Sequence, residues 1–174
     1  MNKKSVLKIV VPVIMVLTIG ALWFMSYQND KKVEEEQLAL ADFALHTNSI
    51  DLDALKKHNL PIIIDFGADE CVPCKAMKPV LEKVNSDMQG KSIIKFVDVW
   101  KNPTAAQNFP VQIIPTQILI NADGTAYMPG EEVYMQIPLM KYVGENEEDH
   151  LFTVHQGALT EEQMLLILKD MGVK

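Results

Sequence analysis

Residues 61–75, PIIIDFGADECVPCK, place an apolar run directly before two closely spaced cysteines. Three consecutive isoleucines followed by Asp65 and Phe66 form the β-branched pattern of a strand buried at the centre of a sheet. The following segment, residues 74–90, is amphipathic and ends at a glycine, which predicts a helix with a glycine stop. A buried strand followed at once by such a helix predicts an α/β domain.

The rest of the chain continues this alternation. Thr160 and Gln163, three residues apart, fit a capping box at the start of a final helix. The order of segments predicts a central mixed sheet flanked by helices. The other expected elements are a short strand at 43–46, a helix at 49–60, strands at 92–100 and 111–121 separated by a short helix at 103–109, a strand at 150–157 and a helix at 159–172.

The first thirty residues differ in composition from the rest. A basic start with Lys3, Lys4 and Lys8 precedes an uncharged run over residues 9–27. As a helix this run reaches roughly 28 Å, close to the thickness of a bilayer core. It is longer than the apolar region of a signal peptide, and its best cleavage candidate, at residues 19–21, begins with a bulky isoleucine. We therefore expect a retained single span with the domain outside the cytoplasm, rather than a cleaved signal peptide.

The charge of the remaining chain excludes one class of partner. Residues 29–174 carry 13 lysines, no arginine and all 23 acidic residues, a formal charge of about −10. Because phosphate contacts need clustered positive charge, nucleic-acid binding is not expected.

The two cysteines, Cys71 and Cys74, have three interpretations: half of a zinc site, a structural staple or a redox pair. A structural zinc site needs four ligands, and the four histidines show no paired spacing. A structural disulfide here would close a very small loop and stabilise little. A redox pair fits the position, because the start of a helix stabilises the thiolate of Cys71 and Pro73 suits the first turn. The histidines are His46, His58, His150 and His155.

The segments IIIDFGADECVPCKAMKPVL, IIPT and VHQGALTEEQ, in this order, resemble thioredoxin-fold thiol–disulfide oxidoreductases of the thioredoxin type over about residues 43–174. The resemblance implies that Cys71 is the nucleophile and Cys74 the resolving thiol. It also implies that Asp65 is the buried acid that accepts the proton of the resolving cysteine. No metal is expected, and no cofactor beyond the redox-active Cys71–Cys74 disulfide.

The same resemblance implies a substrate-binding surface beside the cysteines. Pro115 matches the family's cis-proline, which packs against the dithiol, and Ile114 would offer its backbone to an extended substrate segment. Pro79 matches the proline that kinks the active-site helix. The remaining expected substrate-binding residues are Val72, Pro73 and Gly157.

Several positions depart from the family's pattern. The family usually has a tryptophan where Gly67 stands, another aromatic residue at Glu70, and a lysine where Phe96 aligns. Loss of that lysine is expected to raise the pKa of Asp65, whereas Glu70 should oppose formation of the Cys71 thiolate. Both changes bear on the redox potential and leave the mechanism in place.

The largest departure is residues 122–149, where the family has a tight turn between its last two strands. The methionines and tyrosines of this insertion could cover the sheet edge or form an adaptable contact surface. A strand that starts beside the dithiol at Pro115 runs away from it, so the insertion is expected at the far pole of the domain.

These observations predict three regions: an anchor at 1–28, a charged stalk at 29–42 and a thioredoxin-like domain at 43–174. The expected function is reduction of protein disulfides outside the cytoplasmic membrane, with electrons supplied by a membrane thiol-transfer partner. Two alternatives remain: a disulfide oxidase or isomerase, and a non-catalytic binding module with a static disulfide.

Overall fold

The computed structural model of the protein describes residues 19–29, 40–144 and 149–174. These residues belong to two units, one ending at Ala41 and the other beginning at Asp42. The second unit is the folded domain and carries both cysteines.

In the first unit, residues 19–29 form a helix. Most of the predicted anchor (1–28) and stalk (29–42) lies outside the described residues. Within the described residues, no helix combines the length and the hydropathy that a membrane span requires.

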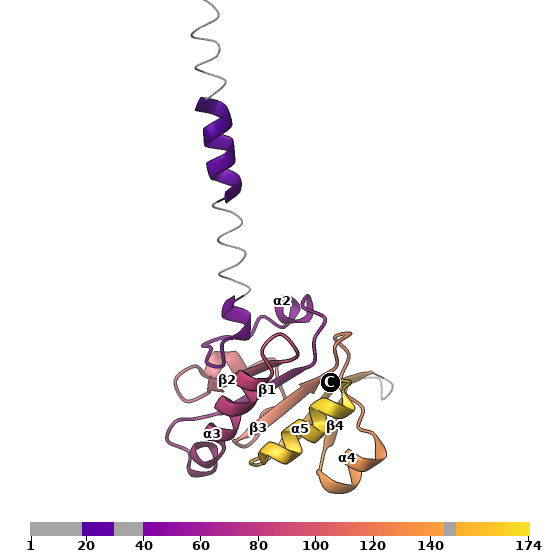
Figure 1. The fold of residues 1–174 in the computed structure, drawn as a ribbon. Helices are drawn as coiled ribbons and strands as arrows, with labels where there is room; N and C mark the ends of the chain where they lie inside the picture. Colours follow the sequence, from indigo (N-terminus) through magenta and orange to yellow (C-terminus); the bar gives the residue numbers. More distant parts are fainter. Residues whose placement is uncertain (1–18, 30–39, 145–148) are drawn as a thin grey trace, which may run out of the picture. The chain divides into compact units, whose positions relative to one another are not determined.

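The domain is built on a mixed five-stranded sheet with the strand order β2-β1-β3-β5-β4 (Figure 1). The β1 and β2 strands are parallel, and every other neighbouring pair is antiparallel. All residues of β1, β2 and β3 are buried, as their apolar composition predicts. The strands are β1 (Ile62–Gly67), β2 (Ile93–Asp98), β3 (Thr116–Ile120), β4 (Met140–Val143) and β5 (His150–Gln156).

Helices cover both faces of the sheet, as the sequence predicts. One apolar core, which includes Ile63, Ile94 and Leu119, lies under α3, α4 and α5. The other lies under α2 and the 3₁₀ helix η1. The helices are α2 (Leu52–Lys56), α3 (Val72–Asp87), η1 (Pro103–Ala106), α4 (Glu131–Gln136) and α5 (Glu161–Asp170).

The predicted capping box at the start of α5 is confirmed. The Thr160 hydroxyl accepts from the Gln163 backbone N–H at 3.2 Å, and the Gln163 side chain accepts from the Thr160 N–H at 3.0 Å. Two free N–H groups of the helix start are thereby bound. The α3 helix ends at Asp87, and Gly90 follows with a φ of +72°, in agreement with the predicted glycine stop.

The strands expected at 43–46, 92–100 and 111–121 are all shorter in the structure. The strand expected at 43–46 is reduced to one bridge between His46 and Phe96. The strand expected at 111–121 begins only at Thr116. Pro115, joined to Ile114 by a cis peptide bond, has no N–H to donate to a neighbouring strand.

The insertion at 122–149 adds α4 and the edge strand β4 to the domain. Its Tyr127 is 1% exposed, and its hydroxyl donates to Asp170 at the end of α5. Ile137 is also buried in the core under α4 and α5. In contrast, Met135 is 78% exposed. The first part of the insertion is therefore an integral part of the core, although it also carries exposed apolar side chains.

We expect Ile137→Ala to destabilise the whole domain, because it would leave a cavity in the core shared with α5. The expected loss in the free energy of unfolding is about 2–5 kcal/mol. The matched control, Met135→Ala, removes an exposed side chain and should change stability by less than about 0.5 kcal/mol. Urea unfolding measures both; equal, small effects would mean that the insertion is only attached to the surface.

Candidate active site

The two cysteines lie at the start of α3, directly after the buried strand β1. Cys71 is the N-cap residue, with extended backbone, and its Sγ accepts from the Cys74 N–H at 3.4 Å. Pro73 stands in the first helical turn, where its missing N–H is not needed. The two cysteines are joined by a disulfide with Cα atoms 5.2 Å apart. The structure thus places Cys71 at the N-cap of α3 and Cys74 in its first turn.

The predicted substrate-binding residues lie around this pair. The Ile114–Pro115 peptide bond is cis, as the resemblance implies, and the Ile114 carbonyl oxygen lies 4.0 Å from Cys71 Sγ. The Gly157 N–H donates to the Pro115 carbonyl at 2.9 Å, with a φ of +115° that favours glycine. Val72 is 78% exposed. The segment before β3 and the segment after β5 therefore lie beside the start of α3, at one end of these strands.

The predicted acid, Asp65, lies at the centre of β1 and is fully buried. Its Oδ1 accepts from Nε2 of Gln117 on β3 at 2.5 Å, and its Oδ2 has no hydrogen-bond partner. Burial raises the pKa of Asp65 to about 7, although the Gln117 hydrogen bond acts in the opposite direction. The pKa of Asp65 is thus raised, as expected, but the main cause is burial rather than the loss of a lysine at Phe96.

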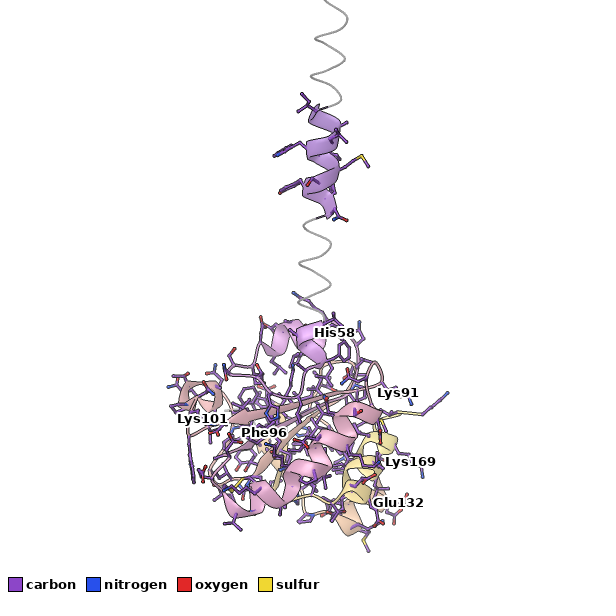
Figure 2. The ribbon with its side chains drawn as sticks, turned by 60° about the vertical axis from the view of Figure 1, so that its left-hand side comes forward. His58, Lys91, Phe96, Lys101, Glu132 and Lys169 are labelled. Carbon is purple, nitrogen blue, oxygen red and sulfur yellow. A yellow bond between two sulfur atoms is a disulfide. The ribbon has the colours of Figure 1, made fainter. Side chains whose placement is uncertain are left out.

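Gly67 and Phe96 occupy the space between this acid and the cysteines. A Cβ placed on Gly67 would lie 2.8 Å from Phe96 Cε2, 3.3 Å from Cys74 Sγ and 3.4 Å from Asp65 Oδ2. Phe96, which is 8% exposed, points into the domain beside α3 (Figure 2). Its ring therefore leaves no room for a larger side chain at Gly67, so the two departures from the family's pattern belong together.

The active-site loop is held by an acid that the sequence reasoning missed. Asp98, at the end of β2, accepts from the backbone N–H groups of Asp69, Trp100 and Lys101, each at 3.0 Å. Burial would raise the pKa of Asp98, but these hydrogen bonds lower it below its ordinary value. Lys101, at the domain surface, also pairs with Asp69 (Figure 2). The loop before Cys71 is thereby tied to the loop after β2.

Glu70 lies close to Cys71 in sequence, but its charge is shared with another group. Its carboxylate pairs with the Lys75 ammonium at 3.2 Å, and both side chains are more than half exposed. Solvent and this ion pair weaken the expected opposition of Glu70 to a thiolate at Cys71.

A cavity of about 230 Å³ lies beside Cys74. Its wall includes the two positive side chains of Lys75 and Lys78. In the described part of the chain, this cavity included, no group of three or more His, Cys, Asp and Glu side chains could hold a metal ion. The other residues lining the cavity are Leu45, His46, Ala68, Asp69, Cys74, Leu81 and Phe96.

Comparison with known proteins agrees with this geometry. The family model described as Thioredoxin matches residues 42–154. The chain belongs to the thioredoxin family. Thioredoxin 1 of Chlorobaculum tepidum is 40% identical over 67 residues, which cover 38% of this chain and 66% of that protein. Thioredoxin of Mycobacterium tuberculosis is 43% identical over 61 residues, or 35% of this chain and 53% of that protein.

The aligned part thus spans about half to two thirds of these thioredoxins. A crystal structure of chloroplastic thioredoxin z has a TM-score of 0.52 and 22% identity, and the match covers 74% of this chain and 93% of that one. This likeness supports the thioredoxin fold.

One buried polar residue of this thioredoxin-family site was not found from the sequence. Gln117 lies directly opposite Asp65 in the antiparallel pairing of β1 and β3. The signal available was a polar residue within the apolar run TQILI, at residues 116–120. Only the register between the two strands shows that this residue faces the acid.

The raised pKa of Asp65 predicts a pH-dependent stability. Between about pH 4 and 7 the folded protein holds a proton that the unfolded chain has lost, so the free energy of unfolding falls as pH rises through this window. We therefore expect Asp65→Asn to be more stable than the wild type at pH 8, by at most about 4 kcal/mol. This gain should disappear near pH 4.

Urea unfolding of the oxidised proteins across this pH range measures the effect. The control is Asp123→Asn, since hydrogen bonds from Thr125 lower the pKa of that exposed carboxyl. It should give no gain at pH 8. A stability difference for Asp65→Asn that is the same at pH 4 and pH 8 would contradict the assigned protonation.

Proposed function

We propose that the protein is a thiol–disulfide oxidoreductase that exchanges disulfides with protein substrates through Cys71 and Cys74. The observation that carries the proposal is the disulfide at the N-terminus of α3, within 4.0 Å of the Ile114 carbonyl and above the buried Asp65. Membership of the thioredoxin family supports it. Thioredoxins act through their own cysteine pair, so the reaction calls for no further cofactor.

The reduced protein begins the reaction with the thiolate of Cys71. The helix N-terminus stabilises this thiolate, which attacks one sulfur of the substrate disulfide. The substrate S–S bond breaks, a mixed disulfide forms on Cys71, and the first substrate thiolate leaves and takes up a proton.

Cys74 completes the exchange. Its thiol loses a proton to the carboxylate of Asp65, and the resulting thiolate attacks Cys71 Sγ. The mixed disulfide breaks, the Cys71–Cys74 disulfide forms, and the second substrate sulfur leaves as a thiolate that takes up a proton. Two electrons pass from the dithiol to the substrate. A carboxyl whose pKa is about 7 is well matched to accept this proton at neutral pH.

The substrate would lie across the exposed surface around Cys71. Val72 and Ile113 are both more than half exposed, and Ile114 stands at the start of β3 beside the disulfide. An extended substrate segment could therefore pair with the backbone of Ile114 while apolar side chains contact Val72 and Ile113. Pro115 and Gly157 hold this backbone in place.

We further propose that the domain acts as a reductant outside the cytoplasm, tethered by its N-terminal segment and recharged by a membrane thiol-transfer donor. The basic start and the uncharged run over residues 9–27 support the tether. Reduction is the proposed direction because, in the described part of the chain, no large helical insertion of the kind found in strongly oxidising relatives separates the sheet strands.

We expect Cys74→Ser to accumulate mixed disulfides with protein substrates, because the resolving thiol is absent. The measurement is non-reducing electrophoresis after acid trapping, followed by identification of the bound proteins. The matched control, Cys71→Ser, lacks the attacking thiol and should trap none. Equal trapping by both variants would contradict the assigned roles, and no trapping by either would favour a non-catalytic binding module.

The proposed location predicts that Cys71 of the reduced full-length chain is labelled in intact cells by a membrane-impermeant maleimide. The protein should also stay with membranes after an alkaline carbonate wash. Labelling only after cell lysis would contradict a domain outside the cytoplasm, and release by the wash would contradict the tether.

A further inference from the structure

A row of buried polar side chains crosses the sheet below the disulfide. Asp65 on β1 pairs with Gln117 on β3, and Gln117 pairs with His155 on β5. Directly opposed residues of antiparallel strands lie on the same face, with Cβ atoms about 4.5–5.5 Å apart. The exposed fractions of Asp65, Gln117 and His155 are 0%, 0% and 5%. Three polar residues therefore stand side by side where an apolar core would be expected.

Gln117 makes only part of the hydrogen bonds that its amide can form. Its Nε2 donates to Asp65 Oδ1 at 2.5 Å and lies 3.5 Å from Met77 Sδ. Its Oε1 has no partner, and neither has Asp65 Oδ2, although both atoms are buried. Such unmet groups destabilise a fold, so an apolar residue at position 117 would serve packing better. This arrangement points to a role in the chemistry of Asp65.

The amide of a glutamine can bind a carboxyl group in either protonation state. Its N–H can donate to an ionised carboxylate, and in the structure it donates to Asp65 Oδ1. After a half-turn about the last side-chain bond, the free Oε1 can instead accept the O–H of the protonated acid. A lysine could only donate, and would favour the ionised state alone.

We propose that Gln117 is the positioning residue for Asp65, holding its carboxyl toward Cys74 both before and after it takes the proton of the resolving thiol. The proposal rests on the proposed function, because it assumes that Asp65 accepts this proton. On the other side of Asp65, the β2 residue paired with it is Phe96, at the position where the family usually has a lysine. The neutral amide of Gln117 on β3 would therefore do for the carboxyl what that cation does in the family.

The other titratable groups around Asp65 are few. On α3 they are Cys74, and Lys75 and Lys78 in the adjoining cavity, which His46 and Asp69 also line. On β5, burial lowers the pKa of His155, although its hydrogen bond with the Pro138 carbonyl at 3.0 Å acts in the opposite direction. His155 is thus neutral at pH 7.

On β2, Lys95 neighbours Phe96 in sequence and lies on the other face of the sheet, where its Nζ donates to the Ala44 carbonyl at 2.9 Å. Among the described residues, none of these cations hydrogen-bonds the Asp65 carboxyl, whose Oδ1 accepts from Gln117 and whose Oδ2 has no partner.

The test is the titration of the Asp65 carboxyl carbon by NMR in oxidised, full-length, ¹³C-aspartate-labelled protein. Gln117→Met keeps the length of the side chain and removes the amide. Loss of the N–H donor disfavours the carboxylate, so the titration midpoint of Asp65 should rise by about one pH unit or more. The pH profile for release of a mixed disulfide between Cys71 and a small aromatic thiol should move in the same direction.

Three further variants make the outcomes distinct. Gln117→Glu keeps the shape and adds a second carboxyl, which should split the titration into two steps, the upper one above the wild-type midpoint. In an Asp65→Asn background, Gln117→Met should cause no further change in the pH profile. His155→Gln should leave the Asp65 midpoint where it is in the wild type.

An Asp65 midpoint that is unchanged in both Gln117→Met and Gln117→Glu would overturn the positioning role and leave the proposed function intact. If Asp65→Asn alone left the pH profile of mixed-disulfide release unchanged, the proposed role of Asp65 would fail. The positioning role would then fail with it, even where the midpoint moved.

Discussion

The buried carboxyl of Asp65 is the constraint on which the rest of the site depends. It lies at the centre of the sheet with a single hydrogen bond, and one of its oxygens has no partner. A buried polar group without a partner costs about 1–3 kcal/mol, and more when it is charged. A chain that keeps such a group must stabilise the sheet elsewhere, here by two apolar cores that cover both faces.

The surroundings of Asp65 connect local sequence to chemistry. Phe96 covers the acid from β2, and Gly67 leaves room for the ring, so the carboxyl is shielded from water and its pKa rises to about 7. Cys74 lies one helical turn after the N-cap residue Cys71, on the same side of the sheet as the Asp65 carboxyl. The start of α3 favours a thiolate at Cys71, while burial keeps the acid able to take a proton. Within residues 65–74, one position thus favours a negative charge, on Cys71, and another disfavours it, on Asp65.

Much of this could be predicted from the sequence, because the relevant signals are local. The run of isoleucines before Asp65, the glycine after α3 and the capping box at Thr160 each depend on neighbouring residues, and each element lies where expected. The thioredoxin resemblance placed the cysteines and the cis-proline correctly, and the structure brings both to one edge of the sheet.

The features that were missed depend on contacts between distant segments. Gln117 faces Asp65 only because β3 pairs with β1 in one particular register, which no periodicity specifies. Asp98 holds the active-site loop through the backbone N–H of Asp69, 29 residues away in the chain. The strand expected at 43–46 does not form, because in the folded domain this segment pairs with β2 through a single bridge, between His46 and Phe96.

The central claim is that Cys71 and Cys74 form a reversible redox couple. The most direct measurement equilibrates the full-length protein with thiol–disulfide buffers of known potential and quantifies the reduced fraction after alkylation. The account predicts one reversible two-electron transition, nearer to about −270 mV than to the roughly −120 mV of a strong oxidant. A pair that never equilibrates with the buffer would contradict the account, because a static disulfide cannot exchange with a substrate.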